Sequence, residues 1–191
     1  MTAGEVLLWV GGAVVVLALL LVFSYNRFVA QRTTIDAAWA GIDTELQRRH
    51  DLIPNLVETV RGYAAHEAAV LQAVTEARSR AVAATSPDVA VRDQARAEDA
   101  LTQGLSGLLA LNERYPSLRA DGVFRDLQRQ LVETEDRIAA SRRLYNLEVA
   151  DYERRRGSVP SNLVASWFSF EPRESFEILD AAAQHAPQVS I

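Results

Sequence analysis

The three histidines are the first candidates for catalytic or metal-binding chemistry, and their spacing supports neither. Di-iron sites in helical bundles use Glu-x-x-His pairs, in which a glutamate precedes each histidine by three residues. The residues at that position here are Gln47, Tyr63 and Ala182. His66 and Glu67 resemble the opening of a zinc-protease helix, but Val70 occupies the position of the second histidine. The sequence therefore predicts no metal site.

Motifs for nucleotide binding and acyl transfer are also missing from the sequence. It contains neither GxxxxGKS/T nor GxGxxG, whose glycines let a backbone approach phosphates. The segment Gly104-Leu105-Ser106-Gly107 lacks the spacing of a serine nucleophile elbow. Without cysteine there is no thiolate ligand, cysteine nucleophile or disulfide. Since no nucleophile, base and orienting group occur together, we expect no catalytic residue, no enzyme activity, no cofactor and no small-molecule substrate.

A cluster of polar residues with both charge signs surrounds Pro54 and is the nearest approach to a site. Its members are Asp43, Arg49, Asp51, Asn55 and Glu58. One hypothesis is that they form a docking surface for another membrane protein, or a polar network that joins helices. The alternative is helix capping and pairing between residues four apart on a solvated face, which the sequence favours because such pairs are common on helices. If the cluster has a function, the hypothesis is that it is a partner-docking site.

Length and composition indicate the kind of fold that positions the polar cluster. The chain has 191 residues, room for one membrane anchor and one domain of about 165 residues. Only nine glycines and six prolines interrupt it, which favours long helices and an all-α fold. All twenty basic residues are arginine, and the net charge is -5, so nucleic acid is not an expected partner.

Residues 6–23, from Val6 to Phe23, predict a transmembrane helix after a short tail of residues 1–5. This uncharged run of eighteen residues spans about 27 Å as a helix, enough to cross a bilayer. The alternative is a cleaved signal peptide, but the preceding MTAGE has no basic residue and no small-x-small site follows promptly. Arg27 and Arg32 follow the span, so the positive-inside rule places the C-terminal domain in the cytoplasm and the short N-terminus outside.

After the span, helical periodicity continues through most of residues 24–170. Apolar residues at helical spacing predict an amphipathic helix from Ser24 to Arg49, and Pro54 predicts a kink or short break. A second apolar stripe runs from Ile53 to about Ala84, where a turn at residues 85–88 reverses the chain. A third helix is expected from about Asp88 to Arg114, in which Gly104 and Gly107 either weaken the helix slightly or permit close packing.

The last long helix has the clearest repeat, with an apolar residue every seven positions. These residues are Phe124, Leu131, Ile138, Tyr145 and Tyr152. Thr134, Ser141 and Glu148 interrupt the second row that a strict coiled coil requires, so a globular bundle fits better. The stripes also predict that Trp39, Tyr63, Tyr145 and Tyr152 are core aromatics.

The end of the last long helix and the aromatic segment that follows it each allow two interpretations. Three arginines, 154–156, oppose the negative end of the helix dipole, an explanation that needs no ligand; an anionic-lipid contact is the alternative. The aromatic segment 160–170 either caps the core or rests on the membrane. Residues 171–191 form a C-terminal tail whose last ten or so residues we expect to be disordered.

Several segments, taken together and in order, resemble the LemA family of membrane-anchored bacterial proteins. They are Tyr25-Asn26, Ile35-Asp36, Trp39, Ile42-Asp43, the run RRHDLIPNLVE at 48–58, Gly62-Tyr63, TEAR at 75–78, TEDRIA at 134–139, Arg142, Tyr145-Asn146 and PSNLV at 160–164. Asp136 stands where the family often has asparagine, and Val159 where an aromatic residue is common. The resemblance covers nearly the whole chain.

The resemblance implies an antiparallel four-helix-type bundle on the cytoplasmic side of the bacterial inner membrane. It supplies no catalytic residues. The expected function is a membrane-tethered, non-enzymatic interaction or scaffold protein that binds the bilayer through Val6 to Phe23 and also binds other membrane proteins or itself. The alternative, which rests on family association alone, is an accessory subunit or regulator of an integral-membrane enzyme such as an envelope quality-control protease.

Overall fold

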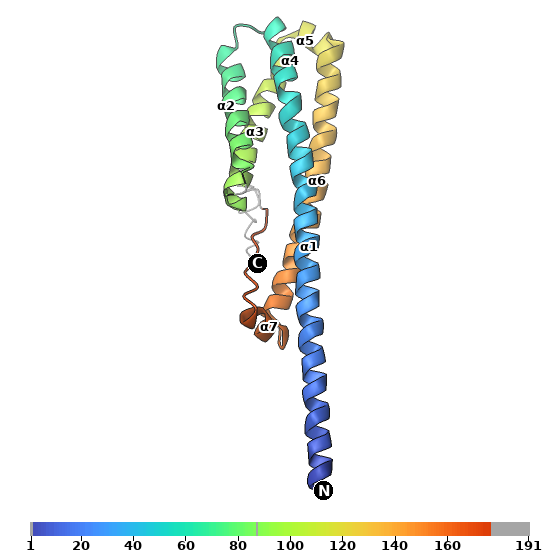
Figure 1. Cartoon of the computed structure of the whole chain (residues 1–191). Coiled ribbons are helices and arrows are strands. Elements are labelled where there is room, and N and C mark those ends of the chain that lie inside the picture. Colours follow the sequence, from blue (N-terminus) through green and yellow to red (C-terminus); the bar gives the residue numbers. More distant parts are fainter. Residues whose placement is uncertain (1, 87, 177–191) are drawn as a thin grey trace, which may run out of the picture. The chain divides into compact units, whose positions relative to one another are not determined.

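The computed structural model describes residues 2–86 and 88–176, and every regular element in these residues is a helix (Figure 1). The helices are α1 (Ala3–Tyr63), α2 (Ala68–Ala84), α3 (Val91–Leu109), α4 (Leu111–Arg114), α5 (Pro116–Ala120), α6 (Gly122–Gly157) and α7 (Ser161–Trp167). The predicted all-α class is confirmed. The prediction of a disordered C-terminus falls on residues outside the described ranges, as does Pro87 in the predicted turn.

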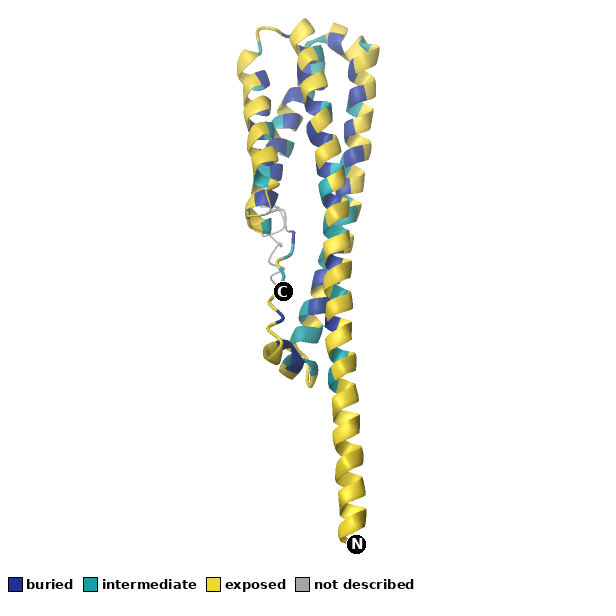
Figure 2. Cartoon of the chain, viewed as in Figure 1, coloured by how far each residue is buried: buried dark blue, intermediate teal, exposed yellow. Residues whose placement is uncertain are grey.

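The N-terminal part of α1 is the candidate membrane span. Its leucine and valine side chains are exposed on every side of the helix (Figure 2), with Leu7 and Leu8 more than three quarters accessible. Within the described residues, α1 is the one helix that is long and apolar enough to cross a membrane. Exposure of so many apolar side chains to water is unfavourable, whereas a bilayer buries them. The predicted transmembrane segment is therefore helical, and its exposed apolar surface is suited to a bilayer.

The described chain forms two compact units, and α1 and α6 contribute residues to both. We call the first the anchor unit, which comprises residues 2–39 and 144–173. The second is the bundle unit, which comprises residues 40–143 except 87, together with 174–176. The sequence treats residues 24–170 as a single bundle, and these domain boundaries stay a prediction.

In the bundle unit, residues of α1, α2, α3 and α6 surround one apolar core, as Figure 2 shows in dark blue. Ile53, Leu56, Val57 and Val60 lie on one face of α1 because they follow helical spacing. The partners on the other helices include Leu71 and Val74 of α2, Leu101, Leu105 and Leu108 of α3, and Phe124 and Leu131 of α6. Short connections between α1, α2 and α3 reverse the chain, so the expected antiparallel bundle is confirmed.

Pro54 lies inside α1 and does not interrupt it. Of the predicted kink or short break, the break is therefore wrong, and the kink stays a prediction. The chain reverses later, at residues 64–67, which divides the predicted helix from Ile53 to Ala84 into two. The apolar pattern did not reveal this turn because Val60, Ala64 and Leu71 point into the same core on both sides of it. Glu67 holds the turn, since its carboxylate accepts a hydrogen bond of 3.1 Å from the Tyr115 hydroxyl.

The expected third helix also ends early. It begins at Val91 and stops at Leu109, and the short helices α4 and α5 occupy most of the residues before α6. Asp121 then starts α6, because its Oδ1 accepts a hydrogen bond of 2.7 Å from the Phe124 amide. Proline at the first position of α5 explains the break after Arg114, since the residue before a proline disfavours helical backbone.

In the anchor unit, α7 and the chain that follows it pack on α1 and α6. Phe170 stacks on Phe28 with ring centroids 4.7 Å apart, and Phe28 contacts Tyr152 edge to face. The tail therefore covers an apolar core, although Trp167 and Phe168 remain exposed.

Three of the four predicted core aromatics pack in the anchor unit. Tyr145 and Tyr152 are buried, and Trp39 lies against Tyr145 with ring centroids 5.1 Å apart. The prediction for Tyr63 is wrong, because its ring is exposed and its hydroxyl donates to Asp121 at 2.9 Å.

Candidate functional site

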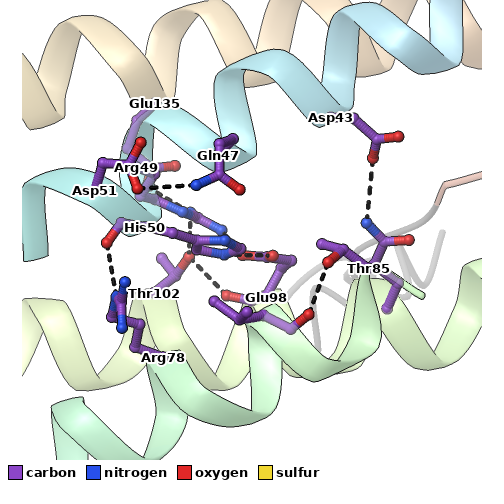
Figure 3. Close-up of polar contacts among 12 residues, drawn as sticks. Asp43, Gln47, Arg49, His50, Asp51, Arg78, Thr85, Glu98, Thr102 and Glu135 are labelled. Carbon is purple, nitrogen blue, oxygen red and sulfur yellow. Dashed lines mark hydrogen bonds and ion pairs between the residues drawn. The ribbon is translucent and has the colours of Figure 1, made fainter.

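Arg49 is the centre of a buried charged network in the bundle unit (Figure 3). It lies on the inner face of α1, three residues after Leu46 and four before Ile53, and only 2% of it is exposed. One terminal nitrogen, Nη2, donates to Oε2 of Glu98 on α3. The other, Nη1, donates to Glu135 Oε1 of α6 at 2.6 Å and to Thr102 Oγ1 of α3 at 3.1 Å. A single guanidinium thus joins three helices.

The second oxygen of Glu98 contacts the neighbouring histidine. His50 Nε2 lies 2.9 Å from Glu98 Oε1, so both carboxylate oxygens are occupied. His50 is fully buried and Glu98 is 3% exposed. A charged residue this deep is tolerated only when it is paired and hydrogen bonded, and Glu98 meets both conditions.

Arg78 connects α2 to the same region through the backbone. Its Nε donates a hydrogen bond of 2.7 Å to the carbonyl oxygen of His50. In a helix this carbonyl accepts from the amide four residues later, which is position 54. Pro54 has no amide hydrogen, so the carbonyl of His50 lacks that partner. Arg78 supplies the missing donor and allows α1 to continue through the proline.

The charges stabilise one another against the cost of burial. Burial by itself lowers the pKa of Arg49, but the negative charges of Glu98 and Glu135 outweigh it, so the pKa is raised. Burial likewise opposes ionisation of Glu98, but the hydrogen bond with His50 and the charge of Arg49 hold its pKa below the usual range. Both groups are therefore ionised at neutral pH.

This arrangement is suited to holding helices together. Both terminal nitrogens of Arg49 and both carboxylate oxygens of Glu98 already have partners within the protein. Glu135, which pairs with Arg49, differs from Arg49 and Glu98 because about 40% of its side chain is exposed to solvent. Among the described residues, no group of three or more histidine, cysteine, aspartate or glutamate side chains is arranged to hold a metal ion.

The structure separates the five residues of the predicted docking site. Arg49 is buried in the network, so it does not lie on a solvated face. Asp43 is half-buried, and its Oδ1 lies 3.5 Å from Nε2 of the buried Gln94. The other three residues, Asp51, Asn55 and Glu58, are exposed on α1.

Local pairing accounts for two of these exposed residues. Gln47 donates to Asp51 at 2.8 Å, which is the expected pairing between residues four apart. Arg61 pairs with Glu58 at 3.0 Å. The docking role of the cluster stays a prediction.

Sequence reasoning missed Arg78, Glu98, Thr102 and Glu135. Glu98 carried a signal, because it lies three residues before Leu101 and seven before Leu105 and so shares their buried face. A charged residue on an apolar stripe requires a partner of opposite sign, and Arg49 lies on the corresponding stripe of α1. Helical spacing could not reveal that these two residues meet, since 49 positions separate them.

Comparison with known proteins supports the resemblance seen in the sequence. A model of the LemA family matches residues 38–191. Magnetosome protein MamQ 2 and Magnetosome protein MamQ 1 of Paramagnetospirillum magneticum (strain ATCC 700264 / AMB-1) are each 26% identical over 179 residues, covering 82% of this chain and 66% of their own length. Magnetosome protein MamQ of Magnetospirillum gryphiswaldense is 25% identical over 154 residues, covering 69% of this chain and 57% of that protein. The chain therefore spans between 57% and 66% of the length of these curated relatives.

Proposed function

The chain belongs to the LemA family, and on this premise we propose that it is a membrane-tethered, non-enzymatic interaction protein. The observation that carries the proposal is the Arg49 network, in which both terminal nitrogens of Arg49 and both carboxylate oxygens of Glu98 have partners within the protein. The charges of Arg49 and Glu98 are buried and paired with each other, so they serve the stability of the bundle rather than a reaction. The apolar span in α1 confines the bundle to a membrane, which raises its effective concentration for other proteins there.

We propose that the membrane is the bacterial inner membrane, with the short N-terminus outside and the bundle in the cytoplasm. Arg27 and Arg32 follow the span within about ten residues, whereas the N-terminal flank carries Glu5. Basic residues favour the cytoplasmic side. A cysteine introduced at Gly62, which is exposed, tests this orientation: in spheroplasts it should resist an impermeant thiol reagent until the membrane is opened.

The proposed docking surface is the exposed face formed by Asp51, Asn55 and Glu58. These residues follow one another at steps of four and three, so they lie on the same side of α1. None of them contributes to the apolar core, and Glu58 is 75% exposed. The surface therefore offers two carboxylates and an amide to a partner without requiring the bundle to open.

Crosslinking in intact membranes, followed by extraction and mass spectrometry, tests this proposal. The docking variant changes Asp51→Ala, Asn55→Ala and Glu58→Ala. A matched control changes Asp126→Ala, Gln130→Ala and Glu133→Ala, three exposed residues of α6 with the same spacing and charge. We expect the docking variant to lose crosslinks that the control retains, with unchanged helicity in both. Equal crosslinking of the two variants would refute the docking surface.

The identity of the crosslinked protein decides between two forms of the function. Crosslinks only to a second copy of the chain would indicate a homo-oligomeric scaffold. A single recurrent membrane enzyme, whose activity changes when this chain is removed, would instead indicate an accessory subunit or regulator.

A further inference from the structure

A polar pocket of about 280 Å³ lies in the anchor unit, apart from the Arg49 network. Arg27 and Gln31 line it from α1, and Asp151, Arg154 and Arg155 line it from the last turns of α6. Ser161, at the start of α7, is also part of the lining. Three arginines face one aspartate, so the lining carries a net positive charge.

Two of the arginines have no ion-pair partner among the residues that the structure describes. Arg154 pairs with Asp151 at 2.9 Å, but within the described ranges neither Arg27 nor Arg155 forms an ion pair. A buried donor in the pocket wall also lacks a partner: Arg155 Nε makes no hydrogen bond to any residue the structure describes. A buried N–H donor normally has an acceptor, so this atom points to a ligand that offers acceptor oxygens.

The dipole of α6 explains only part of this charge. Cations at residues 154–156 are favourable at the negative end of that helix. Arg27, however, lies in the interior of α1, where the helix dipole offers it no such stabilisation. The positive-inside rule accounts for a basic residue near the end of the span, and Arg27 also places its charge in the same pocket as Arg155.

The pocket lies next to the C-terminal end of the apolar run in α1. Arg27 follows Phe23, the last residue of the apolar run, by four residues, or about 6 Å along the helix. Exposed aromatic rings surround this level: Tyr25 contacts Phe168 with ring centroids 4.9 Å apart, and the neighbouring Trp167 is 68% exposed. Tyrosine and tryptophan are enriched at membrane interfaces because they are apolar with one polar edge.

We propose that this pocket binds the phosphate group of an anionic phospholipid. Arg27 and Arg155 would donate hydrogen bonds to the phosphate oxygens, because guanidinium groups match phosphate geometry. The acyl chains would extend beside the apolar span of α1, and Trp167 and Phe168 would rest among the headgroups. The inference requires membrane tethering but not the docking surface of Asp51, Asn55 and Glu58.

Native mass spectrometry of the full-length protein in mild detergent tests the proposal with phosphatidylglycerol and phosphatidylcholine as probes. We expect the protein to retain phosphatidylglycerol in preference to phosphatidylcholine. The double variant Arg27→Gln and Arg155→Gln should bind phosphatidylglycerol roughly 10- to 30-fold more weakly. Arg27→Gln alone, an exposed change that does not threaten folding, should weaken binding roughly fivefold.

A matched control and a competitor make the result decisive. Arg80→Gln and Arg119→Gln remove two exposed arginines from the bundle unit and should leave lipid binding unchanged. An equal loss of phosphatidylglycerol binding in this control would refute the pocket as the binding site, because the effect would then depend only on the total charge of the protein. Inorganic phosphate should not displace the lipid at equal concentration. Displacement by phosphate would overturn the lipid assignment, since a free anion would then suffice.

Discussion

The Nε atom of Arg78 lies 2.7 Å from the carbonyl oxygen of His50, the acceptor that Pro54 leaves without its helical amide. A proline inside a helix normally breaks or kinks it. Here a side chain from the neighbouring helix α2 supplies the lost hydrogen bond, and α1 continues to Tyr63. This contact brings α2 to the backbone of the residue that also contacts Glu98.

Replacing Arg78→Met should lower the free energy of unfolding by about 1–3 kcal/mol, because the carbonyl of His50 loses its donor. In a Pro54→Ala background the cost should fall by about 1 kcal/mol, since alanine restores the backbone amide at that position. Chemical denaturation followed by circular dichroism measures both. Arg80→Met, an exposed change on the same helix, is the control. Equal costs of Arg78→Met in the two backgrounds would show that Pro54 and Arg78 are not coupled.

Replacing Arg49→Met should destabilise the bundle by about 3–5 kcal/mol, because Glu98 would remain buried without the arginine that pairs with its charge. The double variant Arg49→Met and Glu98→Leu should cost less than Arg49→Met alone, since it removes both charges. Denaturation midpoints of the two variants and of the wild type test this order. Additive losses in the double variant would mean that packing, and not charge pairing, sets the stability at this site.

The stability of the bundle should fall in acid, in part through Glu98. The folded state lowers the pKa of this carboxyl, so the unfolded chain takes up a proton at a pH where the folded chain does not. The contribution of Glu98 is complete above the unfolded pKa of about 4.3 and is lost as the pH falls through the lower folded value. Glu98→Gln should therefore show a shallower loss of stability between about pH 5 and about pH 3, a range that brackets the unfolded pKa.

Denaturation at several pH values measures this difference in slope. Glu76→Gln is the control, because Glu76 is an exposed glutamate of the same unit. A wild-type slope in Glu98→Gln would exclude Glu98 as a source of acid sensitivity.

The sequence predicts the features of this protein that depend on local patterns. The apolar run of residues 6–23 and the stripes at Ile53, Leu101 and Phe124 follow from side-chain periodicity, and so the span and the bundle could be predicted. Local sequence patterns do not predict features that depend on contacts between residues far apart in the chain. Pro54 alone predicts a break. The helix continues because Arg78, 28 positions after His50, donates a hydrogen bond to the His50 carbonyl oxygen.

The same limit explains the outcome for the candidate site. Arg49 resembled a surface residue because Arg48 precedes it and Asp51 follows it, both charged and exposed. Its buried partners, Glu98 and Glu135, are contributed by α3 and α6, and no local pattern connects them.

Gly104→Ala should raise the free energy of unfolding by about 0.5–1 kcal/mol. A Cβ atom at this position would lie 3.5 Å from Cγ2 of Val74, an ordinary contact, and alanine restricts the unfolded chain more than glycine does. Gly107→Ala, where a Cβ meets nothing within 4 Å, is the matched control on the same helix. If Gly104→Ala alone destabilised the protein, close packing of α2 against α3 would be the reason for the glycine.

The most direct test of the account compares a core variant and a surface variant in one crosslinking experiment in membranes. We propose that the buried charges stabilise the bundle and that an exposed face of α1 binds partners. Arg49→Met with Glu98→Leu, once circular dichroism shows that it folds, should retain the wild-type crosslinks, whereas the Asp51, Asn55 and Glu58 alanine variant should lose them. A folded core variant that loses the crosslinks, beside a surface variant that keeps them, would contradict the account.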